Sequence, residues 1–186
     1  MIPTRALALA SAFAFAGCGQ QGGAEMSAGV ADPVPGGTVV VGLFSDLDGL
    51  NEFVSTDANA TAVMEYMLYV PLLRWGENLE IEGRLAKSWE FSEDRREITM
   101  QLRDDVFWHD GVPTTADDVK FSFDMFREPA LGYPDQGSLR YLEGVEVLGP
   151  HAVRFRFSRA YADQLAHLRK VILPKHLLEK VPAGEM

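Results

Sequence analysis

Runs of apolar and polar residues in the first half of the chain predict a strand, a helix and a hairpin. Residues 38–44 form a continuous β-branched and apolar run, TVVVGLF, which predicts a buried strand. Residues 58–69 carry apolar side chains at helical spacing, with Asp57 placed to cap the helix and Pro71 placed to end it. Residues 72–83 hold two short apolar runs around a polar turn, which predicts a hairpin.

The second half of the chain contains a different pattern, in which apolar and polar side chains alternate. This period of two is typical of half-buried antiparallel strands. The stretches concerned are residues 89–91, 97–102, 143–148 and 152–157. A polar turn at residues 92–95 joins the first two stretches. We therefore expect two pairs of antiparallel strands.

A strong helix signal separates the two strand pairs. Residues 116–127 have helical periodicity, and Thr115 is the expected N-cap, followed by two acidic residues that face the positive end of the helix dipole. The apolar face expected to be buried consists of Val119, Phe123 and Phe126. Two short helices are expected at residues 161–168 and 175–180. Helices interleaved with strand pairs predict an α/β or α+β fold.

The first 17 residues are predicted to be a signal peptide and not part of the fold. A short, weakly positive start is followed by a largely apolar run of eleven residues, 6–16. As a helix, this run would span roughly 16 Å, which is too short for the ~30 Å hydrocarbon core of a bilayer. Its length and flanks are those of the apolar region of a secretory signal.

Cys18 follows the apolar run after one glycine and is the only cysteine in the chain. Small residues before this cysteine resemble a bacterial lipobox, although Phe15 stands where an aliphatic residue is usual. We therefore predict that Cys18 is lipidated and becomes the mature N-terminus. The alternative is an ordinary exported protein that is cleaved nearby. Residues 18–36 are rich in Gly, Ala, Ser and Pro and predict a flexible tether between the anchor and the domain.

Composition and charge narrow the class of function. The chain has 186 residues, of which 47% are hydrophobic and 24% charged, and this is the composition of one globular domain. A formal charge of -10 opposes binding to nucleic-acid backbones. Four histidines and one cysteine offer little material for a zinc site, and the common nucleotide, zinc-protease and serine-hydrolase motifs are absent from the sequence. We predict no cofactor.

Four polar residues between the predicted strands and helix allow two interpretations. Asp104, Asp105, His109 and Asp110 could form an acid/base or metal cluster, which would make the protein a lipid-anchored metallohydrolase. The other interpretation is structural, because Asp110-Gly111 is a turn signal. We favour the structural interpretation, in which the protein is not an enzyme.

The same region resembles the extracellular solute-binding proteins of family 5, the peptide- and nickel-binding components of ABC importers. The resemblance rests on many residues at fixed spacing. They are Leu85, Ala86, Ser88, Trp89, Asp94, Leu102, Arg103, Trp108, His109, Asp110, Gly111, Pro113, Thr115, Ala116, Asp117, Asp118, Val119, Phe121 and Ser122. Residues 69–72 and 173–176 extend it, with Val70 standing where the family has Glu, so that it covers residues 36–182.

The resemblance implies a type II periplasmic-binding-protein fold with two lobes that close on a ligand. Family members are usually more than twice as long, so residues 37–186 would hold the N-terminal part of the solute-binding domain, within the first lobe. The implied function is an extracytoplasmic lipoprotein, in the periplasm or at the cell surface, that delivers di- or oligopeptides to an ABC permease. Nickel complexes, sugars and opines are other ligands within the family, and a non-functional truncated fragment is a further alternative.

Ligands of open α/β sheets gather beyond the carboxyl ends of strands. The first predicted strand ends at residue 44, so the candidate ligand-binding residues are Ser45, Asp46 and Asp48. A hydroxyl and two carboxylates at this position could take peptide N–H groups or a cation. Tyr161 is a further candidate, because the resemblance places a residue that opens a helix after a strand near the cleft.

Overall fold

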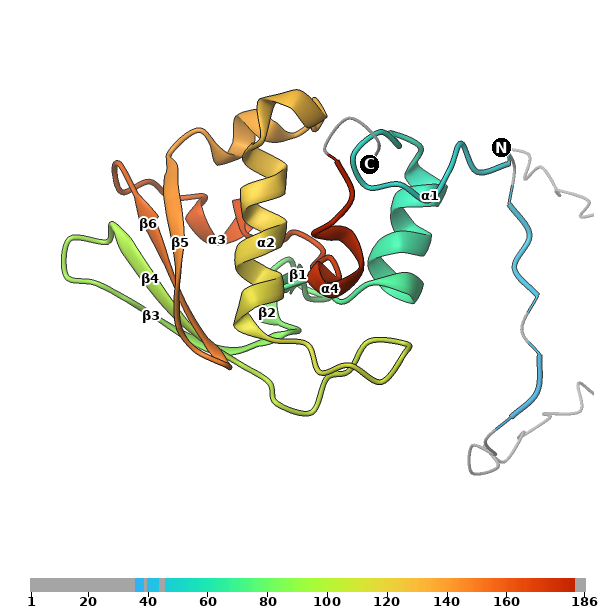
Figure 1. The fold of residues 1–186 in the computed structure, drawn as a ribbon, viewed down its shortest axis with the longest axis horizontal. Coiled ribbons are helices and arrows are strands. Elements are labelled where there is room, and N and C mark those ends of the chain that lie inside the picture. Colours follow the sequence, from blue (N-terminus) through green and yellow to red (C-terminus); the bar gives the residue numbers. More distant parts are fainter. Residues whose placement is uncertain (1–35, 39, 44–45, 183–186) are drawn as a thin grey trace, which may run out of the picture. The chain divides into compact units, whose positions relative to one another are not determined.

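The computed structural model of the chain describes residues 36–38, 40–43 and 46–182 (Figure 1). It divides into two units, residues 1–41 and 42–186, and the regular elements found among the described residues lie in the second. The predictions for the signal peptide, for the lipidated Cys18, for the tether up to residue 35 and for Ser45 fall outside the described residues.

A four-stranded antiparallel sheet forms one layer of the second unit (Figure 1). Its strands, in spatial order, are β3 (Ala86–Phe91), β4 (Glu97–Leu102), β6 (Ala152–Phe157) and β5 (Leu142–Gly149). These are the two predicted strand pairs, joined side by side through β4 and β6, with Ile98 opposite Phe155. The predicted turn between β3 and β4 is confirmed, because the Arg95 amide donates to the Ser92 carbonyl at 2.9 Å.

Helix α2 (Ala116–Arg127) lies across one face of this sheet, as Figure 1 shows. Its start is held by Asp118, whose Oδ2 accepts the Thr115 N–H at 2.8 Å. The predicted apolar face is confirmed: Val119, Phe123 and Phe126 are fully buried. The rings of Phe123 and Phe155 pack edge to face with centroids 4.9 Å apart, so the core lies between α2 and the sheet.

The remaining elements are short. Helix α1 (Ala58–Val63) continues into a π-helical turn, η1 (Met64–Leu68), and the predicted cap is confirmed by a 2.8 Å hydrogen bond from the Ala60 N–H to Asp57 Oδ1. The predicted hairpin is formed by β1 (Leu73–Trp75) and β2 (Ile81–Gly83). Four short helices complete the unit: η2 (Pro129–Leu131), η3 (Gln136–Leu139), α3 (Gln164–His167) and α4 (Lys175–Leu178).

The helices predicted at residues 161–168 and 175–180 are shorter than the sequence suggested, since only α3 and α4 are helical. Helices of this length gain little from their own hydrogen bonds and are set by packing. The Tyr161 ring packs on Tyr141 at 5.3 Å and on Phe157 at 5.8 Å, outside any helix. Tyr161 therefore does not open a helix, contrary to the prediction.

The buried strand predicted at residues 38–44 is wrong for the part that the structure describes. Residues 38 and 40–43 are not in a strand, and Val40 and Val41 are 88% and 61% exposed. β-Branched residues favour a strand only where a neighbouring strand accepts the backbone hydrogen bonds and covers the side chains. None of the strands that the structure describes pairs with this run.

Two polar residues of α2 fasten the helix to the segment before α4. The Ser122 hydroxyl donates to the Asp118 carbonyl at 2.7 Å and accepts the Leu173 N–H at 2.8 Å. The Asp118 carboxylate is 5% exposed and accepts the Lys175 N–H at 3.0 Å. We call these contacts the α2 clamp. They satisfy buried amides of a segment that has no sheet partner of its own, so they fix where α4 begins.

The α2 clamp generates a stability prediction. Replacing Ser122 by Ala leaves the buried Leu173 N–H without an acceptor, which should lower the free energy of unfolding by about 1–3 kcal/mol. Urea unfolding followed by circular dichroism would measure the change. The matched control is Ser138→Ala, because the Ser138 hydroxyl hydrogen-bonds only to the neighbouring Asp135 within the described residues, at 2.8 Å to its carbonyl. Equal destabilisation by both substitutions would show that the clamp has no special role.

Candidate ligand-binding site

The loop at residues 46–57 is held in shape by its own polar side chains. Asp48 Oδ1 accepts the Ser55 hydroxyl at 2.5 Å, and Asn51 Oδ1 accepts the Phe53 N–H at 2.9 Å. The hydrogen bond from Ser55 is the main reason that the pKa of Asp48 is lowered. Phe53 is buried against the Phe126 ring of α2, with centroids 5.8 Å apart. The loop is thus anchored to the core, and these contacts hold the residues between them in place.

Glu52 is the acidic residue that this loop contributes to the lining of a cavity of about 210 Å³. The lining residues are Leu50, Asn51, Glu52, Phe53, Tyr69, Leu173 and Leu178. The Tyr133 hydroxyl donates to Glu52 Oε1 at 3.3 Å. Burial raises the pKa of Glu52 above its ordinary value of 4.5, and the hydrogen bond from Tyr133 opposes this only in part. A half-buried carboxyl in a mostly apolar cavity is a frequent feature of binding sites.

The groups around Glu52 do not neutralise the charge of its carboxylate. Lys170 is 8% exposed, pairs with the Asp135 carboxylate and lies 5.3 Å from the centre of the Tyr133 ring. Its attraction lowers the pKa of Glu52 less than burial raises it. Burial, and next the charge of Glu52, raise the pKa of Tyr133, so its hydroxyl stays protonated and acts as a donor. Within the described residues no ion pair joins Glu52 to a cation.

A second cavity of about 290 Å³ shares the Tyr69 wall with the first. Its lining residues are Leu68, Tyr69, Trp108, His109, Asp110, Pro174 and Leu177. Asp110 Oδ2 lies 2.8 Å from His176 Nε2, and the buried indole N–H of Trp108 has no partner in the described part of the chain. Both cavities have walls from α4 or from the segment before it. The α2 clamp, which positions that segment, therefore shapes both.

The loop predicted to meet the ligand is the loop that lines the first cavity, but the predicted residues do not gather there. Asp46 is exposed, and Asp48 is engaged in holding the loop. The hydroxyl of Tyr161 lies 3.2 Å from His167 Nδ1, beside α3, and Tyr161 lines neither cavity. The sequence reasoning missed Glu52, Tyr69 and Tyr133. The sequence did contain a signal for Glu52. It is an acidic residue directly before an aromatic residue, and it lies in the loop that the sequence had already suggested as a ligand-binding loop.

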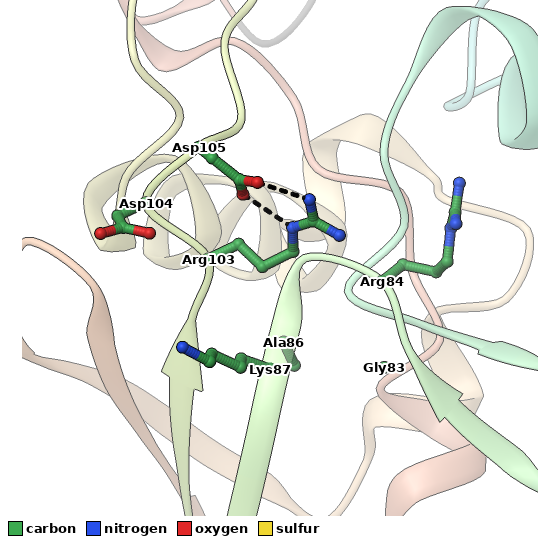
Figure 2. A pocket seen from close by; sticks show the side chains of 7 residues that line it. All are labelled: Gly83, Arg84, Ala86, Lys87, Arg103, Asp104 and Asp105. Atoms are coloured by element: carbon green, nitrogen blue, oxygen red, sulfur yellow. Dashed lines mark hydrogen bonds and ion pairs between the residues drawn. The ribbon is translucent and has the colours of Figure 1, made fainter.

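The polar cluster considered as a metal site is divided among structural contacts. Asp105 accepts two hydrogen bonds from the Arg103 guanidinium, at 2.8 and 2.7 Å, and Figure 2 shows Asp104 directed away from this pair, at the rim of a pocket of about 410 Å³. The Asp110-Gly111 turn is confirmed by the Gly111 N–H donating to the Trp108 carbonyl at 2.9 Å, with Gly111 at a φ of 85°. Across the described ranges, no three His, Cys, Asp or Glu side chains come together in a way that could hold a metal.

The raised pKa of Glu52 makes stability depend on pH in a definite direction. Because the folded pKa lies above 4.5, folding favours the protonated carboxyl; this contribution is full below pH 4.5 and is lost as the pH rises through the raised pKa. Glu52→Gln, which keeps an acceptor for Tyr133, should therefore raise the melting temperature at neutral pH and change it little below pH 4.5. Thermal unfolding over a pH series would measure this.

Asp46→Asn is the matched control for this series, because Asp46 lies in the same loop with an exposed side chain. It should leave the melting temperature nearly unchanged at every pH. A Glu52→Gln effect of the same size in acid and at neutral pH would contradict burial of the charge as the cause.

Comparison with known proteins accounts for this architecture. Residues 80–182 match the model of the "Bacterial extracellular solute-binding proteins, family 5 Middle". The oligopeptide-binding protein AppA of Bacillus subtilis is 30% identical over 88% of the chain and 30% of its own length. The probable D,D-dipeptide-binding periplasmic protein DdpA of Escherichia coli is 31% identical over 71% of the chain and 26% of its own length.

Solved structures agree with the sequence relatives. NikZ from Campylobacter jejuni in complex with Ni(L-His) superposes with a TM-score of 0.69 and 34% identity, over 76% of the chain and 28% of NikZ. AppA from Bacillus subtilis in complex with a nonapeptide gives 0.65 and 30% identity, over 72% of the chain and 27% of AppA.

The expected mixed helix–sheet fold of periplasmic binding proteins is thus confirmed, as a part of that fold. The chain spans between 23% and 30% of the length of the curated relatives that it matches. In the described part of the chain, no helix is long and apolar enough to span a bilayer. The family model, the relatives and the structural neighbours agree, and the chain belongs to the bacterial extracellular solute-binding proteins of family 5, the solute-binding components of ABC transporters.

Proposed function

We propose that this protein is the extracytoplasmic binding component of an ABC importer and that it binds peptides. The observation that carries the proposal is the half-buried carboxylate of Glu52, which faces a mostly apolar cavity and has no ion pair within the described residues. Relatives named as oligopeptide- or dipeptide-binding proteins favour peptides over the other ligand classes.

The chemistry of the cavity suits one end of a peptide. A desolvated carboxylate attracts an ammonium group more strongly than an exposed one, because less water screens the pair. The apolar walls from Leu50, Leu173 and Leu178 would take the neighbouring side chain, and the Tyr69 hydroxyl would bond to the peptide backbone. Asp46 remains a candidate for a second polar contact from the same loop. Binding would close the lobes of the family fold around the ligand without chemical change.

Two parts of the proposal concern the N-terminal region. The signal peptide at residues 1–17 and lipidated Cys18 would place the domain outside the cytoplasm, and residues 18–36 would tether it to the membrane. From this position the protein would pass its ligand to a membrane permease. The apolar run that ends two positions before the single cysteine supports this arrangement.

A titration of peptides tests the binding site. With the protein as its gene encodes it, a dipeptide or longer peptide with a free amino end should bind, as measured by calorimetry. Glu52→Gln should weaken binding by roughly 10- to 100-fold, the range expected on removing a charged partner. The same peptide with an acetylated amino end should bind weakly to both forms.

Two further variants test whether the loss of affinity is specific to Glu52. Asp46→Asn and Tyr161→Phe change residues that the sequence suggested but that do not line the cavity, and each should alter affinity less than Glu52→Gln does. If no peptide binds, or if Glu52→Gln binds peptides as well as the parent protein, the proposal fails.

Lipid attachment is tested separately at Cys18. Cells grown with a radiolabelled fatty acid should label the parent protein, and Cys18→Ser should abolish the label and move the protein from the membrane to the soluble fraction. A labelled Cys18→Ser protein, or an unlabelled parent protein, would rule out the predicted anchor.

A further inference from the structure

The second cavity, of about 290 Å³, borders the first cavity, of about 210 Å³. Both are lined by Tyr69, and consecutive residues of one segment divide between them. Leu173 and Leu178 line the first cavity, whereas Pro174 and Leu177 line the second. Because consecutive Cα atoms are only about 3.8 Å apart, the two cavities are close neighbours.

Backbone hydrogen bonds hold the walls of the second cavity in place. The Ile172 N–H donates to the Val70 carbonyl at 3.0 Å, which ties the residue after Tyr69 to the segment that leads into α4. The Trp108 N–H donates to the Val112 carbonyl at 2.8 Å and closes the turn on the other side. A site whose walls are already ordered loses little conformational freedom when a ligand enters.

The second cavity offers a ligand few free polar groups. Trp108 is 8% exposed and its indole N–H is buried, so its side chain provides the cavity with no donor. Both carboxylate oxygens of Asp110 are engaged, since Oδ1 accepts the Val112 N–H at 3.1 Å and Oδ2 lies 2.8 Å from His176 Nε2. The other lining residues, of which two have polar side-chain atoms, are Leu68, Tyr69, His109, Pro174 and Leu177.

The lining therefore suits a bulky apolar side chain. Aromatic rings pack on one another with centroids about 4.5–7 Å apart, and the Trp108 and His176 rings already do so at 6.4 Å. The space is also the larger of the two cavities. A charged side chain would lose its hydration there without gaining an ion pair from Asp110, whose charge is already bonded.

The second cavity is within reach of a ligand that is bound at Glu52. Burial, and next the charge of Glu52, raise the pKa of Tyr69, so the carboxylate lies close enough to act on the Tyr69 hydroxyl. An extended peptide advances about 3.4 Å per residue, which places its second and third residues within about 7 Å of the first. A peptide with its amino group at Glu52 thus brings these residues to the Tyr69 wall.

We propose that the second cavity receives the side chain of the second or third residue of a bound peptide. It selects phenylalanine or a similarly bulky apolar side chain at that position. This inference rests on the proposed function, because the contact with Glu52 sets where the amino end of the peptide lies. It adds a preference for one class of peptide sequence, which the charge of Glu52 alone does not provide.

Calorimetric titration with tetrapeptides tests the proposal on the protein as its gene encodes it. The reference peptide has four alanines and a free amino end, and three others carry phenylalanine at the second, third or fourth position. Phenylalanine at the second or third position should tighten binding roughly 10- to 100-fold, the range expected for burying its side chain. Phenylalanine at the fourth position should give a smaller gain.

Substitutions in α4 test whether this gain arises in the second cavity. Leu177 is 60% exposed, so the fold should tolerate Leu177→Trp, which fills the cavity, and Leu177→Asp, which makes its wall polar. Each should remove most of the gain from phenylalanine. The matched controls are Leu148→Trp and Leu148→Asp, because Leu148 in β5 is 42% exposed and lines neither cavity. They should leave the gain unchanged, and circular dichroism checks that each variant is folded.

Two results would overturn the proposal. One is the absence of any gain from phenylalanine at the second and third positions, and the other is a gain that survives both Leu177 substitutions. If four alanines bind and Glu52→Gln weakens that binding, either result removes the role of the second cavity and leaves the proposed function intact. Failure of every peptide to bind would remove both.

Discussion

The α2 clamp is the constraint on which both cavities depend. The segment at residues 173–175 belongs to no sheet, so its buried amides need acceptors from elsewhere, and Ser122 and Asp118 supply them. Because Ser122 and Asp118 lie one turn apart on the same helix, they present their oxygens to successive parts of one strand-like segment. The resemblance to family 5 included both residues, and the structure gives a physical reason for them: they join the two-layer core to the segment that contributes to the walls of both cavities.

Glu52, unlike the residues of the α2 clamp, lowers the stability of the fold when it is charged. Burial raises its pKa, so the charged form costs stability at neutral pH, yet the loop is built to hold it in place through Asp48, Asn51 and Phe53. A residue that weakens the fold while its surroundings fix its position is characteristic of a binding site, where a partner completes the interaction. The same reasoning does not apply to Asp105, whose charge is already matched by Arg103.

Much of the fold was predictable because its signals are local. The ends of α2 follow from a cap residue and a periodic apolar face, and the strand pairs follow from alternation. Residues 38–44 show where such reasoning fails, because strand formation there depends on a neighbour that propensity does not specify. The site was only half predictable. The loop could be located from its composition, but the choice of Glu52 over Asp48 depends on Tyr133, 81 positions away in the sequence.

Tyr69 belongs to the wall of both cavities. A displacement of its ring that widens one space must narrow the other, so the two spaces cannot be enlarged together. Simultaneous occupants would therefore compete for room through a single side chain, and this is negative coupling in the thermodynamic sense. A single occupant that spans both spaces over the ring would escape that competition.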